Sequence, residues 1–221
     1  MKRSILITGS SKGLGEALVS KLLLDKKNII LAVSRELSVK QIEYTTSEFS
    51  HFQYDLFNNN LDPLFEFISN SLDSEEFIFI NNASQILPIN TIGNFNNDEI
   101  EKIICLNVNT PIKIVNFLLQ KYGHKKLTFL NISSGAASHA ISGWSLYCCT
   151  KSSIKMFFEV AEKEYVQHTF YTIDPGVIDT EMQNAIRNSV FEKQQDFINF
   201  KTSGVLQTPE EAALKIIKNY L

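Results

Sequence analysis

The N-terminus of the chain joins a short apolar segment directly to a glycine-rich loop and an amphipathic stretch. Ser4–Thr8 is almost uninterruptedly apolar, which is typical of a strand buried on both faces, and Gly13–Asp25 has a helical pattern. Gly9 suits a tight turn between them, while Gly13 and Gly15 would let backbone approach a ligand and let the helix pack on the sheet. The free N–H groups and the dipole of such a helix favour a pyrophosphate. The alternative is a turn whose glycines serve only packing.

Strand and helix patterns alternate along the rest of the 221 residues. Further strands are expected at Ile29–Val33, Phe77–Asn81, Leu127–Ile132 and Thr169–Ile173, with a weaker one at His51–Tyr54. Further helices are expected at Pro63–Leu72, Asp98–Tyr122, Ser145–Val166 and Pro209–Tyr220. Such alternation predicts an α/β fold: a Rossmann-like, doubly wound parallel sheet with right-handed crossovers and helices on both faces.

Three segments interrupt this alternation. Asn58–Asn60 and Asn90–Asn97 are rich in asparagine and are expected to be loops. Asn184–Gly204 is polar and aromatic without a clean period, and we expect it to form a mobile lid. No low-complexity linker divides the chain, so residues 1–221 are expected to form a single domain.

Composition argues against several classes of partner. The net charge of −3 gives no electrostatic reason to expect nucleic acid or an anionic membrane. The apolar run at Ile5–Ile7 is too short for a signal peptide, and no apolar stretch approaches the roughly 20 residues of a membrane helix. The three cysteines are odd in number and two are adjacent, which favours a reduced, cytoplasmic location. The four histidines are scattered without metal-ligand spacing, so no metal site is expected.

The strongest chemical signal is a tyrosine, a lysine and a serine. Tyr147 and Lys151 are four residues apart, so they share one face of a helix, and Ser134 precedes Tyr147 by thirteen residues. A tyrosine with a pKa of about 10 releases its proton poorly, and a nearby ammonium would lower that pKa. Tyr147 could then protonate a carbonyl oxygen while hydride reaches the carbon, with Ser134 holding the same oxygen.

A second Tyr-x-x-x-Lys pair tests how specific this signal is. Tyr122 and Lys126 have the same spacing, but Gly123 between them is expected to end a helix. The position thirteen residues before Tyr122 is Asn109 rather than a serine. The Tyr147 pair is therefore the candidate.

The end of the second strand indicates which nucleotide would bind. An acidic residue there would bind the ribose hydroxyls of NAD. This chain instead has Ser34 and Arg35, with Lys12 in the glycine loop. A guanidinium and an ammonium suit a 2′-phosphate, which predicts NADP(H). The alternative is that Arg35 and Lys12 are solvated surface charges.

With these residues in place, the chain resembles the short-chain dehydrogenase/reductase family from Ser4 to about Tyr220. The motifs occur in the family's order: Thr8–Gly15, Asp55-Leu56, Asn81-Asn82-Ala83, Asn107, Asn131-Ile132-Ser133-Ser134, Tyr147/Lys151 and Asp174-Pro175-Gly176 with Thr180. Two further segments, Gly143–Cys148 and Asp179–Gln183, are similar to the sepiapterin reductase and benzil reductase branch of this family. That branch reduces ketones and vicinal dicarbonyls with NADPH.

The resemblance implies roles for individual residues. The Asp55 position contacts adenine, Asn107 kinks a helix and holds a water that relays protons to the lysine, and Lys151 also binds the nicotinamide ribose. The catalytic set is Ser134, Tyr147, Lys151 and Asn107. The cofactor set is Gly9, Ser11, Lys12, Gly13, Leu14, Gly15, Ser34, Arg35, Asp55, Leu56, Asn82, Ala83, Tyr147, Lys151, Pro175, Gly176, Val177, Ile178 and Thr180.

Two departures from the family pattern are visible. Ser84 stands where the family usually has glycine after Asn-Asn-Ala, which is tolerated if its φ is not positive. The sequence ends at Leu221, so the family's usual last strand and tail are expected to be missing. Part of the usual tetramer surface lies there, which favours a homodimer through the helices Asp98–Tyr122 and Ser145–Val166.

The substrate is expected to be a small carbonyl compound in an apolar pocket. Beside Ser134 and Tyr147, the pocket residues are expected to be Ile86, Trp144 and Met182. The alternative for Met182 is that it only covers the core. Two other functions stay open: reduction of 3-oxoacyl thioesters on an acyl carrier or coenzyme A, and NADP(H) sensing without turnover.

Overall fold

The computed structural model describes residues 2–44, 46–71 and 74–221, which contain a six-stranded parallel sheet. The strands pair in the order β3-β2-β1-β4-β5-β6. Their bounds are β1 (Arg3–Thr8), β2 (Asn28–Ser34), β3 (Phe49–Gln53), β4 (Glu76–Asn81), β5 (Lys126–Ile132) and β6 (Thr169–Ile173). Every expected strand is found, and the weak candidate is the edge strand β3. The strand order reverses between β1 and β4, where open α/β sheets form a ligand crevice at the strands' carboxyl ends.

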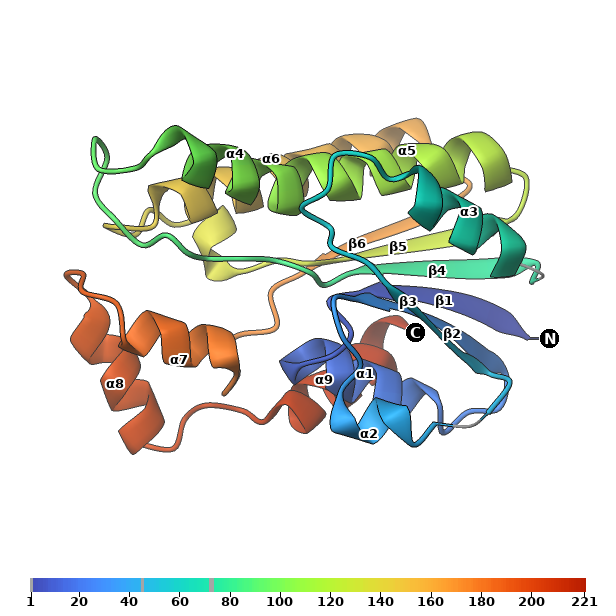
Figure 1. Ribbon diagram of the computed structural model, residues 1–221, viewed down its shortest axis with the longest axis horizontal. Helices are drawn as coiled ribbons and strands as arrows, with labels where there is room; N and C mark the ends of the chain where they lie inside the picture. Colours follow the sequence, from blue (N-terminus) through green and yellow to red (C-terminus); the bar gives the residue numbers. More distant parts are fainter. Residues whose placement is uncertain (1, 45, 72–73) are drawn as a thin grey trace.

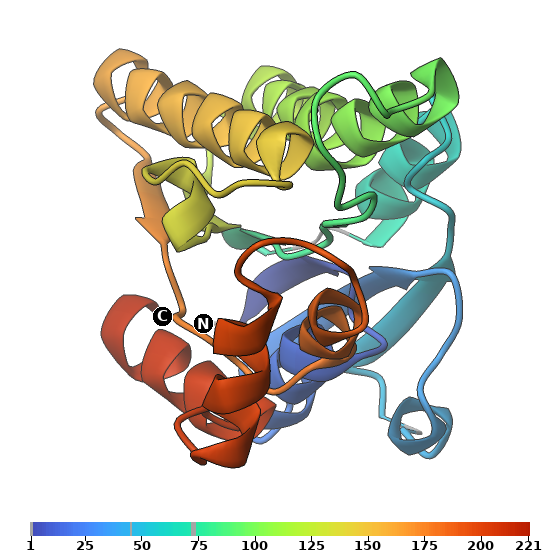
Figure 2. The ribbon, with the colours of Figure 1, turned by 90° about the vertical axis from the view of Figure 1, so that its left-hand side faces the viewer.

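Helices cover both faces of this sheet, as predicted (Figure 1). One layer holds α3 (Asp62–Ser71), α4 (Asn97–Ile104), α5 (Thr110–Tyr122) and α6 (Ser145–Glu164), and the other holds α1 (Gly13–Leu22), α2 (Val39–Ile42) and α9 (Pro209–Tyr220). Two more helices, α7 (Glu181–Arg187) and α8 (Gln194–Thr202), lie beyond the carboxyl ends of the strands (Figures 1 and 2).

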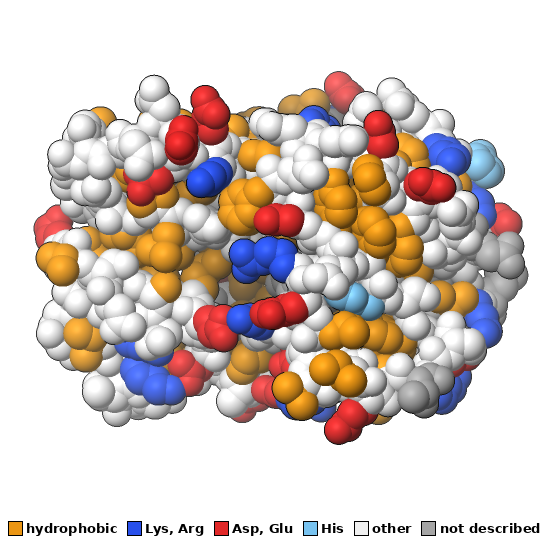
Figure 3. All heavy atoms as spheres, in the orientation of Figure 1, with side chains coloured by type: hydrophobic (Ala, Val, Ile, Leu, Met, Phe, Trp, Pro, Cys, Tyr) orange, Lys and Arg blue, Asp and Glu red, His pale blue; other side chains and the backbone are white. Residues whose placement is uncertain are grey.

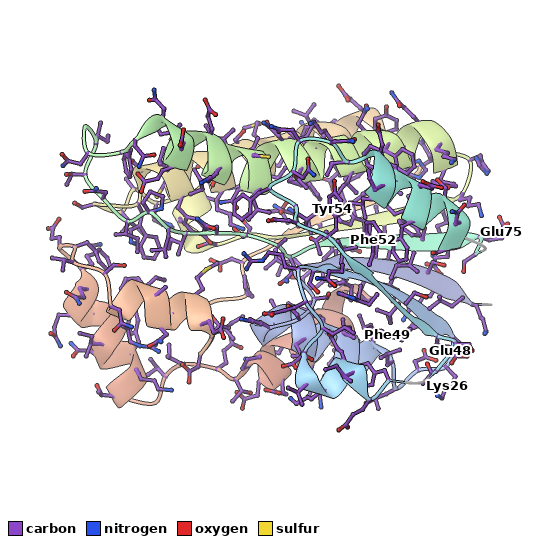
Figure 4. All side chains as sticks on the ribbon, in the orientation of Figure 1. Lys26, Glu48, Phe49, Phe52, Tyr54 and Glu75 are labelled. Atoms are coloured by element: carbon purple, nitrogen blue, oxygen red, sulfur yellow. The ribbon has the colours of Figure 1, made fainter. Side chains whose placement is uncertain are left out.

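The hydrophobic core explains why the strand sequences are continuous apolar runs. Leu6 of β1 belongs to the cluster under α3, α5 and α6, while Ile5 and Ile7 belong to the cluster under α1 and α9. All three are fully buried, because helices cover both faces. On the edge strand β3 the same alternation places Phe52 toward α3 and Phe49 toward the opposite layer (Figure 4).

The expected helix Asp98–Tyr122 is one helical run with a change of pitch inside it. Cys105–Asn109 forms a π turn between α4 and α5. By length and apolar composition the run Asn97–Tyr122 could cross a membrane, so the expectation that no apolar stretch approaches the length of a membrane helix is wrong. Half of its most apolar 18-residue window is nevertheless buried inside the protein, as in a core helix.

Other differences from the sequence expectations concern helix ends and missed helices. The first helix ends at Leu22 rather than Asp25, and α6 ends at Glu164 rather than Val166; Leu72, the expected end of another helix, lies outside the described residues. The Asn184–Gly204 segment contains the end of α7 and all of α8. The short helix α2 was missed, although Ser38 and Gln41 form a capping box with the spacing that marks a helix start.

Candidate active site

A cleft of about 510 Å³ opens at the carboxyl ends of the strands. It is bordered by the glycine loop, the ends of β2 and β3, the segment after β4, the helix α6 and the start of α7. In the space-filling view, basic and acidic side chains meet in the middle of the molecule between the two helix layers (Figure 3). Most of the expected cofactor residues line this cleft: Gly9, Ser11, Lys12, Gly13, Leu14, Gly15, Ser34, Arg35, Asp55, Leu56, Asn82, Ala83, Tyr147, Lys151, Pro175, Ile178 and Thr180.

The glycine loop is shaped by close backbone contacts. Gly9 has a φ of +66°, and a Cβ there would meet the Ala83 Cα at 2.9 Å. A Cβ on Gly15 would lie 2.1 Å from the Gly9 carbonyl oxygen, so α1 can begin this close to the loop only with glycine. Asn82 Nδ2 donates to the carbonyl oxygens of Thr8 and Gly9, each at 3.0 Å. No side chain caps the start of α1 at Lys12, so its first N–H groups stay open to the cleft.

Charges around the cleft are more mixed than the sequence suggested. Lys12 Nζ lies 3.3 Å from a Glu36 carboxylate oxygen and 3.4 Å from one of Glu181, and these two carboxylates raise its pKa. Arg35 forms no salt bridge with the described residues, although it borders the same cleft. The Ser34 hydroxyl donates to the Glu36 carbonyl oxygen at 2.7 Å, so it is engaged by the protein. Arg35 is therefore the most available cation beside the end of β2.

Tyr147 and Lys151 meet on one face of α6, as their spacing predicts. Both residues are only 5% exposed, and the Lys151 ammonium lies 5.6 Å from the centre of the Tyr147 ring. Lys151 Nζ donates to the Ile132 carbonyl oxygen at 2.9 Å, which fixes it at the end of β5. The competing pair does not form such a site, because Tyr122 ends α5 in the core while Lys126 is an exposed residue of β5.

Burial dominates the acid–base properties of this pair. It raises the pKa of Tyr147 to about 12, against the lowering effect of hydrogen bonds from the Ser134 and Ser84 hydroxyls. It also lowers the pKa of Lys151 to about 8, while the nearby Asp174 carboxylate acts in the opposite direction. The expectation that Lys151 brings down the pKa of Tyr147 is thus not met in this structure, because both groups are removed from water.

Asn107 lies in the π turn and ties the catalytic helix to the segment after β4. Its Oδ1 accepts the Gln85 backbone N–H at 2.9 Å, and its Nδ2 donates to the Gln85 carbonyl oxygen at 2.8 Å and to Thr150 Oγ1 at 3.1 Å. The Asn107 side chain is therefore held on both its oxygen and its nitrogen. Ser84, the departure from the family pattern, has no positive φ, so its side chain is accommodated without backbone strain.

An apolar cluster adjoins the phenol at the far end of the cleft. Ile86, Met182 and Tyr147 border the cleft, and the Tyr147 hydroxyl donates to Met182 Sδ at 4.0 Å. Trp144 does not border the cleft: it is 5% exposed and packs edge-on against the Tyr147 ring, with Phe197 also packed against it. Its expected contact with substrate is therefore corrected to support of the tyrosine.

Four other expected residues also lie outside the cleft lining: Ser134, Asn107, Gly176 and Val177. Ser134 Oγ accepts the Ala136 N–H at 3.2 Å, and its hydroxyl acts on the Tyr147 phenol, which does border the cleft. The Gly176 N–H donates to Asp174 Oδ1 at 3.0 Å, and the Val177 carbonyl oxygen accepts the Gln207 N–H at 3.2 Å; neither residue borders the cleft.

Sequence reasoning missed several residues that border the cleft. Glu36 directly follows Arg35, and an acidic residue at the end of the second strand could have been recognised from the sequence as bordering the cofactor site. Ser133 and Gln183 are buried, and their side-chain oxygens have no hydrogen-bond partner among the described residues. No local pattern marks such positions, because their burial depends on segments distant in sequence. Within the same described residues, no group of three histidine, cysteine or acidic side chains could hold a metal ion.

Comparison with known proteins places this site in context. A benzil reductase ((S)-benzoin forming) of Bacillus subtilis is 32% identical over 93% of this chain and 88% of its own length. A benzil reductase ((S)-benzoin forming) of Bacillus cereus is 30% identical over 99% of this chain and 94% of its own. Among solved structures, the KRED1-Pglu enzyme superposes with a TM-score of 0.87 at 24% identity, covering 96% of this chain and 92% of that one.

Solved structures of the same fold hold either nicotinamide nucleotide. A 4-hydroxyisoleucine dehydrogenase complexed with NADH has a TM-score of 0.82 at 20% identity, covering 97% of this chain and 89% of that one. A variant of ElxO with NADPH bound has a TM-score of 0.77 at 21% identity, covering 100% of this chain and 92% of that one. The model of the short chain dehydrogenase family matches residues 3–190. The chain therefore belongs to the short-chain dehydrogenase family, whose members are oxidoreductases that use nicotinamide cofactors.

Proposed function

We propose that this protein is an NADPH-dependent carbonyl reductase that converts a small ketone or vicinal dicarbonyl into an alcohol. The observation that carries the proposal is the buried pair Tyr147 and Lys151 at the inner end of a nucleotide-sized cleft. The two benzil reductases similar over nearly the whole chain support a dicarbonyl as substrate. On this proposal, residues 1–221 act as one NADP-binding domain in the cytoplasm.

The cleft residues fit a nicotinamide dinucleotide. The uncapped start of α1 and the close approach allowed by Gly9 and Gly15 suit the pyrophosphate. Asp55 and Leu56 would border the adenine, while Lys151 would bind the nicotinamide ribose. Bound there, the reduced cofactor would supply the hydride that the chain's own side chains cannot. Arg35, which is free of salt bridges among the described residues, favours the 2′-phosphate of NADPH.

The chain's own contribution is proton transfer and orientation. Tyr147 donates its phenolic proton to the carbonyl oxygen, and Ser134 holds that oxygen in line. Burial gives the phenol a pKa of about 12, so the proton is present at neutral pH. Lys151, with a pKa of about 8, remains largely protonated there and favours the phenolate that forms. Asn107 holds the backbone of the segment after β4 against α6.

The substrate end of the cleft favours an apolar carbonyl compound. Ile86 and Met182 border it, and Met182 lies over the hydroxyl of Tyr147, where a carbonyl oxygen would bind. A 3-oxoacyl thioester on a carrier is the second candidate within the family. A sensing role without turnover is less well supported, because Ser134, Tyr147, Lys151 and Asn107 are all present.

The exposed faces of α4 and α6 support a homodimer. Ile104 is 38% exposed, and Met156 and Val160 of α6 are 58% and 43% exposed. These apolar side chains would be buried by a second copy packing on the two helices.

A substrate panel tests the proposal. NADPH oxidation is followed with benzil, sepiapterin, small diketones and acetoacetyl thioesters. We expect rapid reduction of benzil and small diketones and weak activity on the thioesters. A clear preference for the thioesters would favour the carrier-linked function, and tight NADPH binding without turnover on any substrate would favour sensing.

A further inference from the structure

Gln183 brings a buried amide to the border of the cleft. It lies in α7 and is only 7% exposed, yet it belongs to the cleft lining. Its Oε1 has no hydrogen-bond partner among the described residues. The charged side chains of the same helix do have partners: Glu181 lies 3.4 Å from Lys12. Arg187 lies 3.7 Å from Asp179. The Gln183 oxygen is therefore a buried acceptor of α7 that the described protein leaves unsatisfied.

An unsatisfied oxygen at this place is hard to explain by stability. A buried acceptor without a donor destabilises a folded protein, and an apolar side chain of similar size would avoid that cost. The terminal torsion of a glutamine is broad, so a small rotation turns Oε1 of Gln183 toward the cleft that the residue borders. The position fits a side chain whose oxygen is satisfied by a bound ligand.

The helix α7 begins beside the reacting groups. Met182 directly precedes Gln183, and its Sδ lies 4.0 Å from the hydroxyl oxygen of Tyr147. Ile86 and Met182 belong to the same apolar cluster and make this end of the cleft apolar. A ligand whose carbonyl oxygen contacts Tyr147 therefore lies close to Gln183. Few water molecules compete for a hydrogen bond in such apolar surroundings, so one polar group there has a large effect on binding.

The chemistry of the free atom decides which ligand group it takes. An amide oxygen accepts hydrogen bonds and is satisfied by an N–H or O–H group. A plain diketone such as benzil carries neither. Two ligand groups of the proposed reaction do: the carboxamide N–H₂ of the nicotinamide, and a hydroxyl beside the carbonyl of a hydroxy ketone.

We propose that Gln183 is a ligand-binding residue that accepts a hydrogen bond from an N–H or O–H donor on the ligand bound beside Tyr147. This inference rests on the proposed NADPH-dependent reduction of a carbonyl compound. The source of the donor, cofactor or substrate, is distinguished by two sets of measurements on the Gln183→Met variant. Methionine removes the amide and keeps a flexible unbranched side chain.

The first set measures binding of the cofactor alone. Dissociation constants are determined for NADPH and for its 3-acetylpyridine analogue, which keeps the ring carbonyl group but lacks the N–H₂. If the carboxamide is the donor, Gln183→Met binds NADPH about 3- to 10-fold more weakly than the wild type, the effect of losing one hydrogen bond. The affinity for the analogue should then be the same in both proteins.

The second set measures substrate selection at saturating NADPH. The values of kcat/KM are compared for 2-hydroxyacetophenone and 2-methoxyacetophenone, which differ in the O–H donor. If the substrate hydroxyl is the donor, the preference of the wild type for the hydroxyl compound falls about 3- to 10-fold in Gln183→Met, chiefly through KM. The Kd for NADPH should then stay unchanged.

A matched control and a stability measurement complete the test. Gln195→Met makes the same replacement at an exposed glutamine of α8 whose amide donates to Asn199 Oδ1, and it should change neither set. The urea midpoint of Gln183→Met should be no lower than that of the wild type, because no partner is lost. Should the methionine variant fail to fold, Gln183→Leu takes its place.

The outcomes separate this inference from the proposed function. No selective loss in either set, or an equal loss for both members of a pair, overturns the role of Gln183. A wild type that binds NADPH but reduces no carbonyl compound, benzil included, contradicts the proposed function, while the cofactor measurements still decide the role of Gln183. A wild type that does not bind NADPH contradicts both.

Discussion

Replacing Lys151 with methionine would remove a buried ammonium while keeping most of the apolar stem. Burial lowers the pKa of this lysine from 10.5 to about 8. This lowering of the Lys151 pKa, at about 1.4 kcal/mol per pH unit, corresponds to about 3.5 kcal/mol of folding free energy lost to the charged form at neutral pH. The variant also loses the hydrogen bond to the Ile132 carbonyl oxygen, which costs about 1 kcal/mol. We therefore expect Lys151→Met to be about 2 to 3 kcal/mol more stable than the wild type at pH 7.

The pH dependence gives the sharper test. Between pH 8 and pH 10.5 the folded wild type has lost the Lys151 proton, while the unfolded chain still binds it. The unfolded state then holds more protons, so the stability of the wild type rises with pH across this window. The methionine variant lacks this rise, and its advantage should disappear by about pH 10.5.

Urea unfolding of both proteins at a series of pH values measures this difference. Lys155→Met is a matched control on the same helix, because it makes the same replacement at a lysine whose ammonium is bonded to Ser138 Oγ and paired with Glu159 at the protein surface. A constant difference between Lys151→Met and wild type from pH 7 to pH 10.5 would refute the reasoning. The variant should also lose most turnover, which would show that the buried charge is kept for function.

Three further substitutions test the cofactor end and the support of the site. Arg35→Ala should raise the KM for NADPH far more than that for NADH; an equal effect on both would remove Arg35 from the phosphate site. Glu36→Gln should lower the Kd for NADPH several-fold in a binding titration, because it frees Lys12 and removes a carboxylate that repels the 2′-phosphate. An unchanged Kd would mean that Lys12 stays paired with Glu181. Asn107→Ala should lower the free energy of unfolding by about 2 to 4 kcal/mol, since the Gln85 N–H and carbonyl lose their partner, and an unchanged urea midpoint would contradict this.

Local signals were sufficient for the sheet and for the pairing of Tyr147 with Lys151. The apolar strand followed by Gly9 and Gly15 indicated a close-packed turn into a helix. The glycines have no Cβ atoms, so the backbone can make contacts there that no other residue permits. A four-residue spacing on a helix fixes which side chains share a face. The helix α2 was also within reach, because Ser38 and Gln41 form a local capping box.

Features that depend on distant contacts could not be predicted in this way. Lys12 is paired with Glu36 and Glu181, and no sequence pattern links Glu181 to the glycine loop. Trp144 turns beneath the tyrosine because Phe191 and Phe197 of the expected lid pack on it. A π turn and an α turn have nearly the same apolar period, so Cys105–Asn109 looked like ordinary helix.

The central claim is that Tyr147 is the proton donor in an NADPH-dependent reduction, and the Tyr147→Phe variant tests it most directly. Its turnover of benzil and its Kd for NADPH should be measured beside those of Tyr122→Phe, the other tyrosine with a lysine four residues later. We predict that Tyr147→Phe loses about 10²- to 10⁴-fold in kcat with a nearly unchanged Kd, while Tyr122→Phe keeps wild-type turnover. Near-normal reduction by Tyr147→Phe would contradict the account.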